Sequence, residues 1–179
     1  MPNHIRRNIL VEISILTESN FDRYSLDTYV RTHNVKRVYR RKGMEYVLVD
    51  LPYTEDWSLE RKRMIAETIS GSRYITYLAL ENGRVVGFVA LKRQLTDSYM
   101  ILDMMHVSAG HRGNGLGRQL FDIAKAEAAK SGAKALYISA CSSEETIAFY
   151  KAMGAFVTPD PIKEIADDEP FDLQMICKV

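Results

Sequence analysis

Cysteine is scarce in this chain of 179 residues, which contains only Cys141 and Cys177. The two thiols lie far apart in sequence and form no C-x-x-C pair, so the sequence offers neither a zinc motif nor a disulfide framework. We therefore expect no bound metal. A protein without a disulfide framework is most simply placed in a reducing compartment, and we expect a cytoplasmic location.

An excess of charge of one sign is also missing. The chain has 24 Lys and Arg against 23 Asp and Glu, which gives a formal net charge of +1. This balance provides no electrostatic reason to expect binding to nucleic acid or to a membrane surface. The apolar stretch from Ile9 to Leu16 is interrupted by Glu12 and is too short to cross a bilayer. We expect neither a signal peptide nor a transmembrane helix.

The composition is that of an ordinary globular protein, with 46% hydrophobic and 26% charged residues. A chain of this length buries about two thirds of its unfolded surface without help from disulfides or metals. We see no internal repeat and no low-complexity linker. Residues 1–179 are therefore expected to form one domain.

Three glycines within five residues form the most informative motif, Arg112-Gly113-Asn114-Gly115-Leu116-Gly117. A strand-like run, Tyr99 to Val107, precedes the motif, and an amphipathic helix pattern follows it. The free N–H groups at the start of such a helix bind phosphate, and the guanidinium of Arg112 is a forked donor for phosphate oxygens. The spacing excludes G-x-G-x-x-G, because Arg118 replaces its third glycine, and no Lys-Ser or Lys-Thr completes an ATP loop. The motif is therefore interpreted either as a pyrophosphate-binding loop or as a simple tight turn between a strand and a helix.

The elements around this motif predict a meander followed by a crossover. The runs Tyr74–Leu80 and Arg84–Leu91 flank Asn82-Gly83, which is a strong hairpin signal. Tyr99–Val107 follows as the next antiparallel strand. After the loop, the predicted helix leads into the strand Ala135–Ala140, which should lie parallel to Tyr99–Val107.

The first 70 residues give weaker patterns. We expect a strand at Ile9–Leu16, a short helix at Phe21–Thr32, a strand at Met44–Leu51 and a helix at Ser58–Ser70. The segment Arg31–Lys42 carries six Lys or Arg residues. It is either an anion-binding face or a solvated hairpin or edge strand, and we favour the second interpretation.

The last third of the chain predicts one more helix and one more strand. Ser142 and Glu145 have capping-box spacing before a helix that Gly154 ends. Residues 159–170 read as an acidic loop, and Phe171–Val179 as a strand.

Two separated motifs and the order of the elements resemble the GCN5-related N-acetyltransferases, the GNAT family. Leu102 to Val107 followed by Arg112 to Gly117 looks like that family's fourth strand and pyrophosphate loop. Thr146 to Met153 before Gly154-Ala155-Phe156 is similar to its late helix. The resemblance covers about Tyr74–Val179. It implies an α/β (α+β) fold with a mixed, mainly antiparallel central sheet, flanking helices, and a splayed parallel strand pair at the coenzyme site.

The resemblance also implies a reaction. We expect transfer of an acetyl group from acetyl-CoA to a primary amine of a small molecule or protein, by direct attack. The alternative is a non-catalytic acyl-CoA sensor. Residues 74–179 would bind the coenzyme, and the variable residues 1–70 would shape the acceptor side. The residues expected to contact the coenzyme are Met105, His106, Val107, Arg112, Gly113, Asn114, Gly115, Leu116, Gly117, Arg118 and Ser143. Ser143 stands where the family often has Asn, which weakens its assignment.

Two residues are candidates for proton transfer. Tyr150 matches the family's general-acid tyrosine, and a phenol is a competent donor to a departing thiolate. Asp103 is the candidate general base for the acceptor amine, with a water relay as the alternative. Strand alternation points His106 away from the face of Asp103, so we expect a structural or exposed histidine.

The acceptor pocket and the assembly are less determined. The half of the chain that would form this pocket contains Tyr53, Glu55, Asp56 and Trp57. These residues either recognise a cationic substrate or form the entrance to a capped helix. The C-terminal strand pairs either within the sheet or across a homodimer.

Overall fold

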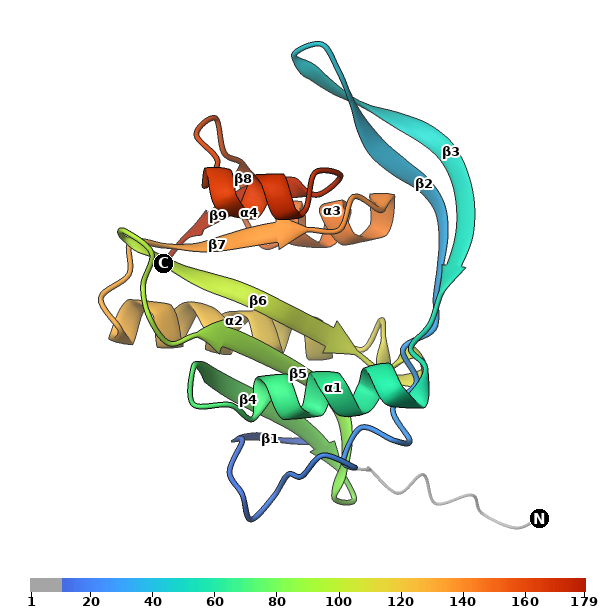
Figure 1. Cartoon of the computed structure of the whole chain (residues 1–179), viewed down its shortest axis with the longest axis vertical. Coiled ribbons are helices and arrows are strands. Elements are labelled where there is room, and N and C mark those ends of the chain that lie inside the picture. The colour runs from blue at the N-terminus through green and yellow to red at the C-terminus, as the bar shows by residue number, and fades with distance from the viewer. Residues whose placement is uncertain (1–10) are drawn as a thin grey trace, which may run out of the picture.

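The computed structural model describes residues 11–179, so Ile9 and Leu10 of the predicted first strand lie outside the described residues. A seven-stranded sheet in the order β1-β4-β5-β6-β7-β9-β8 forms the centre of the protein (Figure 1). Its strands are β1 (Val11–Ile15), β4 (Tyr74–Glu81), β5 (Arg84–Lys92), β6 (Tyr99–Val107), β7 (Ala135–Ala140), β8 (Phe156–Val157) and β9 (Leu173–Lys178).

The β4–β5 hairpin confirms the turn predicted at Asn82-Gly83. Both residues have positive φ, 52° and 75°, as a two-residue turn with the twist of the flanking strands requires. β6 then runs antiparallel to β5, and β7 runs parallel to β6 after the crossover helix α2 (Leu116–Lys130). The predicted mixed sheet with one parallel pair is confirmed.

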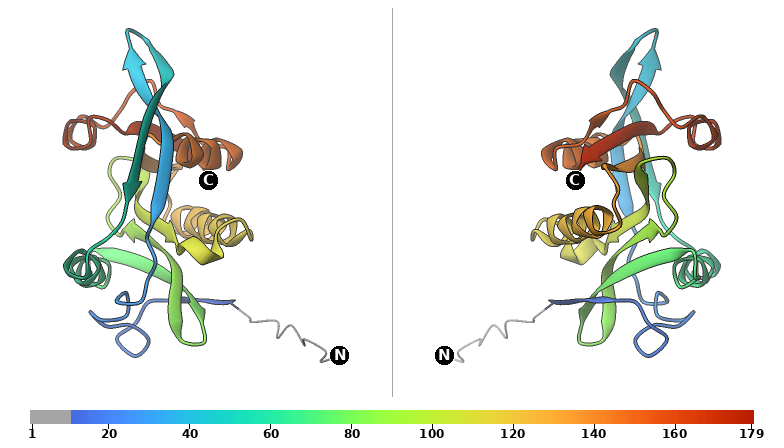
Figure 2. Two further views of the ribbon diagram at one scale, coloured as in Figure 1. Left: turned by 90° about the vertical axis from the view of Figure 1, so that its right-hand side faces the viewer. Right: turned by 90° about the vertical axis from the view of Figure 1, so that its left-hand side faces the viewer.

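Helices cover both faces of the sheet (Figure 2). α2 and α3 (Glu144–Ala152) lie on one face, where Leu120, Phe121 and Ile147 belong to the larger buried cluster. α1 (Leu59–Ile69) and the short α4 (Lys163–Asp168) lie on the opposite face, and Ile65 and Ile69 of α1 pack there against Phe88 and neighbouring apolar residues. We call these two sides the α2/α3 face and the α1/α4 face.

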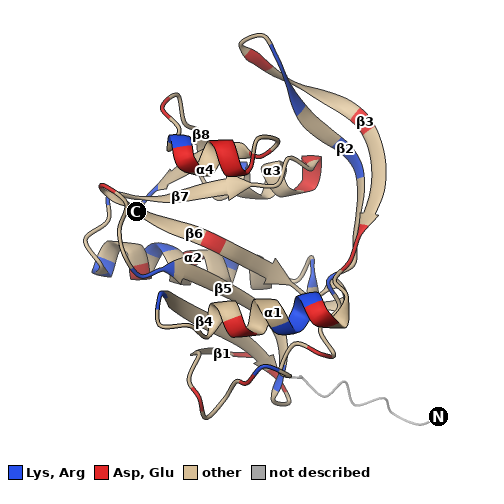
Figure 3. Ribbon diagram, in the orientation of Figure 1, with Lys and Arg blue, Asp and Glu red and all other residues tan. Residues whose placement is uncertain are grey.

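The basic segment forms a hairpin, as expected. β2 (His33–Lys42) pairs with β3 (Glu45–Glu55) in a separate two-stranded sheet, and Lys and Arg gather on β2 while α4 is largely acidic (Figure 3). The hairpin contacts the start of α3. The Tyr39 N–H donates to the Ser142 carbonyl at 2.8 Å, and Arg37 pairs with Glu144. It therefore connects the α1 side of the molecule with α3.

Three local predictions were wrong. Residues 21–32 form turns and irregular backbone rather than a helix. The N-cap of α3 is Ser143 rather than Ser142, because the Ser143 hydroxyl accepts the Thr146 N–H. The acidic segment 159–170 contains the helix α4, and the two-residue β8 was not expected. The helix at 58–70 and the strand at the C-terminus are confirmed, and β9 pairs with β7 and β8 within the sheet.

Candidate functional site

The parallel strands β6 and β7 separate halfway along β6. Their pairing runs from Tyr99–Ala135 to Leu102–Ile138 and ends there, although β6 continues to Val107. A cleft of about 1220 Å³ opens beyond this point. It is lined by the end of β6, the glycine loop, the start of α2, α3, the base of the hairpin, α1 and the segment before β9. A pocket of this volume exceeds a typical small-molecule site of about 300–1000 Å³.

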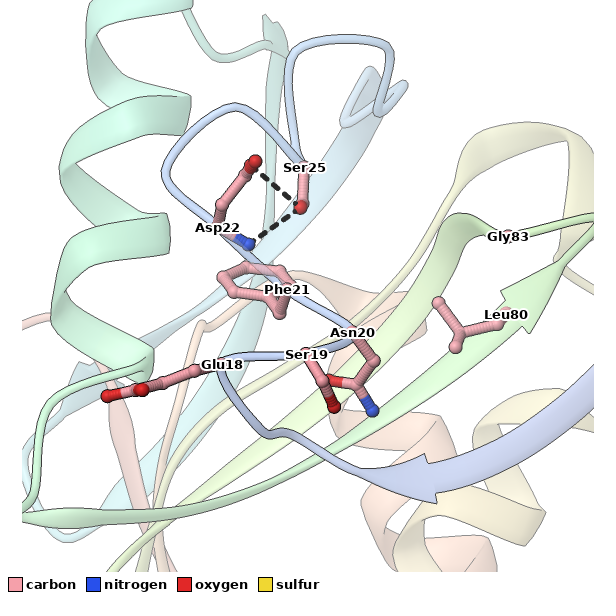
Figure 4. Close-up of a pocket in the computed structure, with 8 residues that line it drawn as sticks. All are labelled: Glu18, Ser19, Asn20, Phe21, Asp22, Ser25, Leu80 and Gly83. Atoms are coloured by element: carbon pink, nitrogen blue, oxygen red, sulfur yellow. Dashed lines mark hydrogen bonds between the residues drawn. The ribbon is translucent and has the colours of Figure 1, made fainter.

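A second, smaller hollow of about 390 Å³ lies near the β4–β5 turn (Figure 4). Its polar groups bind one another, since the Ser25 hydroxyl accepts the Asp22 N–H and donates to the Asp22 carboxylate. None of the residues expected at the site lines it, so the large cleft is the candidate active site.

The glycine loop at one end of the cleft has the geometry of an anion site. Gly113 and Gly115 have φ of 79° and 81°, a left-handed conformation that favours glycine. Gly115 is the N-cap of α2 and provides no side chain, so the first N–H groups of the helix face outward without a capping oxygen. At Gly117, a Cβ would lie 3.3 Å from the Phe149 ring, so a larger residue there would require a small shift of that ring.

Arg112 anchors this loop. Its guanidinium donates to the carbonyls of Val107, Thr32 and Arg31 at 2.9, 2.8 and 3.0 Å. These bonds tie the loop to the end of β6 and to the segment before β2. The sequence suggested that the guanidinium contacts phosphate directly, but in this structure the backbone carbonyls engage it. Arg118 is exposed and also lines the cleft.

A β-bulge in β6 changes which side chains share a face. Met104 pairs with Ala90 and Leu102 with Leu91, so Asp103 is the extra residue. Such a bulge breaks the alternation of period two. The carboxylate of Asp103 accepts a hydrogen bond from the Tyr74 hydroxyl at 2.8 Å and lies 3.2 Å from the Lys92 ammonium.

The bulge corrects the predicted orientation of His106, while the expected structural role agrees with the packing of its ring. The His106 ring packs against Trp57 and Phe88, at centroid distances of 4.8 and 5.5 Å. It therefore lies on the α1/α4 face, the face to which Asp103 also turns through its bond to Tyr74. Burial, followed by the nearby positive Arg31, lowers the pKa of His106 to about 3. The ring is a neutral packing group at physiological pH.

Tyr150 projects from α3 into the cleft and is 6% exposed. Its ring packs against Phe121 and Phe149. Within residues 11–179 its hydroxyl forms no hydrogen bond to another residue, so it is free to donate to a bound molecule. Burial raises the pKa of Tyr150 well above its usual value, which keeps the phenol protonated at neutral pH.

Most of the residues expected at the site come together in this cleft. Those that line it are Asp103, Met105, His106, Val107, Arg112, Gly113, Gly115, Gly117, Arg118 and Tyr150. Asn114, Leu116 and Ser143 are absent from its wall. Leu116 is buried in the core, and Ser143 is fully buried and bonds Thr146 as the cap of α3.

The acceptor side contains residues from both halves of the chain. Glu55 and Trp57 line the cleft, as expected, whereas Tyr53 and Asp56 do not. Glu55 accepts a bond from the Arg31 guanidinium at 2.8 Å. Sequence reasoning missed the cleft residues Ser139 and Asp172. No local signal separates Asp172 from the acidic run before it.

The described part of the chain gives no support to three other features: a metal site, a thiolate nucleophile and a membrane-spanning helix. Residues 11–179 contain no cluster of three His, Cys, Asp or Glu side chains arranged to hold a metal ion. Burial raises the pKa of the Cys141 thiol, which disfavours a thiolate nucleophile. None of the helices in this range has the length and apolar character needed to cross a membrane.

Comparison with known proteins agrees with this geometry. Residues 45–155 match the model of the Acetyltransferase (GNAT) family. No curated protein sequence matches significantly. Among solved structures, nourseothricin acetyltransferase superposes with a TM-score of 0.70 at 16% identity, over 93% of this chain and 96% of that one.

Two further structures share the fold. One is described as a streptothricin acetyltransferase from Bacillus anthracis strain Ames in complex with acetyl coenzyme A, with a TM-score of 0.69 and 19% identity over 95% of this chain and 100% of that one. The other is the Escherichia coli ribosomal-protein-S18-alanine N-acetyltransferase, with a TM-score of 0.56 and 18% identity over 93% and 90%. At such identities the likeness shows a common fold.

Proposed function

Because the chain belongs to the GNAT acetyltransferase family, we propose that it transfers the acetyl group of acetyl-CoA to a primary amine of a small molecule or a protein. The enzyme is an acetyltransferase with acetyl-CoA as its cosubstrate. The observation that supports this reaction best is the cleft where β6 and β7 separate. Its wall contains the glycine loop expected to bind phosphate, Tyr150 and several carboxylates.

The residues of the cleft fit the coenzyme. The uncapped N–H groups at the start of α2 would hold its pyrophosphate, with Arg118 nearby. The backbone of β6 beyond Leu102 has no β7 partner, so its groups around Met105 and Val107 would bind the pantetheine amides, although the Val107 carbonyl already accepts a bond from Arg112. Once bound, the coenzyme supplies a thioester whose carbonyl carbon accepts the amine.

The protein positions the reactants and moves protons. A backbone N–H of β6 near the bulge would stabilise the charge that develops on the carbonyl oxygen. Tyr150 would donate its hydroxyl proton to the departing sulfur. We infer that residues 74–179 form the coenzyme side and that residues 1–70 shape the acceptor side within one domain, since Glu55 and Trp57 reach the cleft from the first half.

Incubation of the protein with acetyl-CoA and a broad amine library, read by mass spectrometry, tests this function. We expect at least one amine to gain a single acetyl group, with release of one coenzyme A thiol. Tight coenzyme binding without any product would instead identify an acyl-CoA sensor. The absence of coenzyme binding would contradict both the acetyltransferase and the sensor.

A further inference from the structure

Asp172 occupies the point where the two strands separate. It lies just before β9 and lines the cleft. Its Oδ2 accepts a hydrogen bond from the Ser139 hydroxyl at 3.3 Å. Ser139 is the first β7 residue beyond the last pair with β6, Leu102–Ile138. The carboxylate is therefore held beside the position that the proposed function gives to the thioester.

A chain of hydrogen bonds orients this carboxylate. The Ile162 N–H donates to the Tyr137 hydroxyl at 3.0 Å, and that hydroxyl donates to Gln174 Oε1 at 2.8 Å. Gln174 Nε2 then donates to the Ser139 oxygen at 2.9 Å, which leaves the Ser139 proton for Asp172. Tyr137 and Gln174 are buried, and a buried network with every member bonded fixes its geometry.

Four other carboxylates line the cleft, of which Glu145 and Glu169 are exposed and the remaining two form ion pairs. Asp103 is paired with Lys92, and Glu55 with Arg31. Within the described residues, no Lys, Arg or His lies within 4.0 Å of the Asp172 carboxylate. A partly buried carboxylate without a cation binds either a cation or a proton. A primary amine with a pKa of about 10 brings both, because it is an ammonium ion at neutral pH.

Building on the proposed acetyl transfer, we propose that Asp172 binds the ammonium group of the acceptor and takes its proton, so that the enzyme selects amines that are cationic at neutral pH. The proton passes from nitrogen to the carboxylate, and the free lone pair attacks the thioester carbonyl carbon. A C–N bond forms, the C–S bond breaks, and the sulfur takes a proton from Tyr150. The amide nitrogen then loses its second proton to solvent, and the Tyr150 phenolate takes a proton from solvent. Asp172 releases the proton that it took from the amine to solvent.

The electrostatic surroundings of Asp172 suit this role. Burial, and then the neighbouring Glu169, raises the pKa of Asp172 to about 6. The carboxylate is thus still ionised at neutral pH and is a stronger base than an ordinary aspartate. The other charged or titratable groups that face it are Glu55 and Arg40 from the hairpin, Cys141 after β7, and Tyr150 of α3.

Thiol release from acetyl-CoA tests the proposal in the full-length protein. The acceptors are n-butylamine, putrescine, spermidine, lysine methyl ester and a peptide with a free N-terminal alanine. The pH profile of kcat/KM is then measured with the best of them for the wild type and for Asp172→Asn, Asp103→Asn and Asp168→Asn. Asp168 is an exposed carboxylate on α4 and serves as the matched control.

We expect Asp172→Asn to lower kcat, and kcat/KM at pH 7, by about 100-fold or more. The acidic inflection of the wild-type profile, near pH 6, should disappear. The deficit should shrink as the pH rises toward the pKa of the amine, because the free amine then needs no base. Ser139→Ala, which removes a bond that lowers the pKa of Asp172, should move the inflection to higher pH. Asp168→Asn should behave like the wild type.

Three results would overturn the proposal. One is a less than about tenfold loss in Asp172→Asn together with an unchanged inflection. The second is a loss of the inflection in Asp103→Asn alone, which would make Asp103 the base. In both cases acetyl transfer itself stands. The third is the absence of thiol release from the wild type with every acceptor, which would reject the proposed function and this inference together.

Discussion

Replacement of Tyr150 by phenylalanine removes one oxygen atom from the cleft, and we expect turnover to fall while the protein stays folded. The ring contacts with Phe121 and Phe149, at centroid distances of 5.9 and 5.3 Å, are retained. The hydroxyl has no partner among residues 11–179, so its removal should change the free energy of unfolding by less than about 0.5 kcal/mol. Loss of a general acid should lower kcat by about 100-fold to 1000-fold, or about 2.7–4 kcal/mol of barrier.

The assay compares two quantities in the same protein. Thiol release gives kcat, and calorimetric titration gives the Kd for coenzyme A, which should rise by no more than about tenfold if one hydrogen bond is lost. Tyr99→Phe is the matched control, because Tyr99 is a partly buried tyrosine of β6 that does not line the cleft. A kcat within about threefold of the wild type would refute the role of Tyr150 as the acid.

Three further predictions concern the loop and the carboxylate. Gly115→Val should abolish coenzyme binding in a calorimetric titration at a cost of about 1–2 kcal/mol in stability, since φ there is 81°, whereas Gly110→Ala should bind normally. Arg112→Ala should lower Tm and raise the KM for acetyl-CoA about tenfold, because three bonds to carbonyls anchor the loop; an unchanged KM would reject this anchoring role. Asp172→Asn should raise Tm at pH 7 but not near pH 4. The pKa of about 6 in the folded state exceeds the ordinary aspartate pKa of 3.8, so ionisation of Asp172 costs stability above pH 6, and this cost fades as the pH falls toward 3.8. Equal Tm shifts at both pH values would contradict this sign.

Elements with local signals were predictable from the sequence. The turn at Asn82-Gly83, the glycine loop and the helix cap at Ser58 each depend on residues within a few positions of one another. The antiparallel meander and the parallel crossover follow from the order of these elements. The resemblance then located the cleft, because Tyr150 and the loop 112–117 belong to motifs about forty residues apart.

Features set by tertiary pairing were not predictable in this way. The bulge at Asp103 exists because β6 pairs with β5 in a shifted register, and it brings His106 to the face that alternation had excluded. Arg112 turns to carbonyls of the segment before β2, which is distant in sequence. Asp172 gains its place only because β9 lies beside β7 and presents it to Ser139.

A crystal structure of the protein with acetyl-CoA tests the central claim most directly. We expect the pyrophosphate against the N–H groups of residues 113–117, the pantetheine beside β6 beyond Leu102, and the sulfur within hydrogen-bond distance of the Tyr150 hydroxyl. Coenzyme bound outside the cleft between β6 and β7, or a sulfur remote from Tyr150, would contradict it.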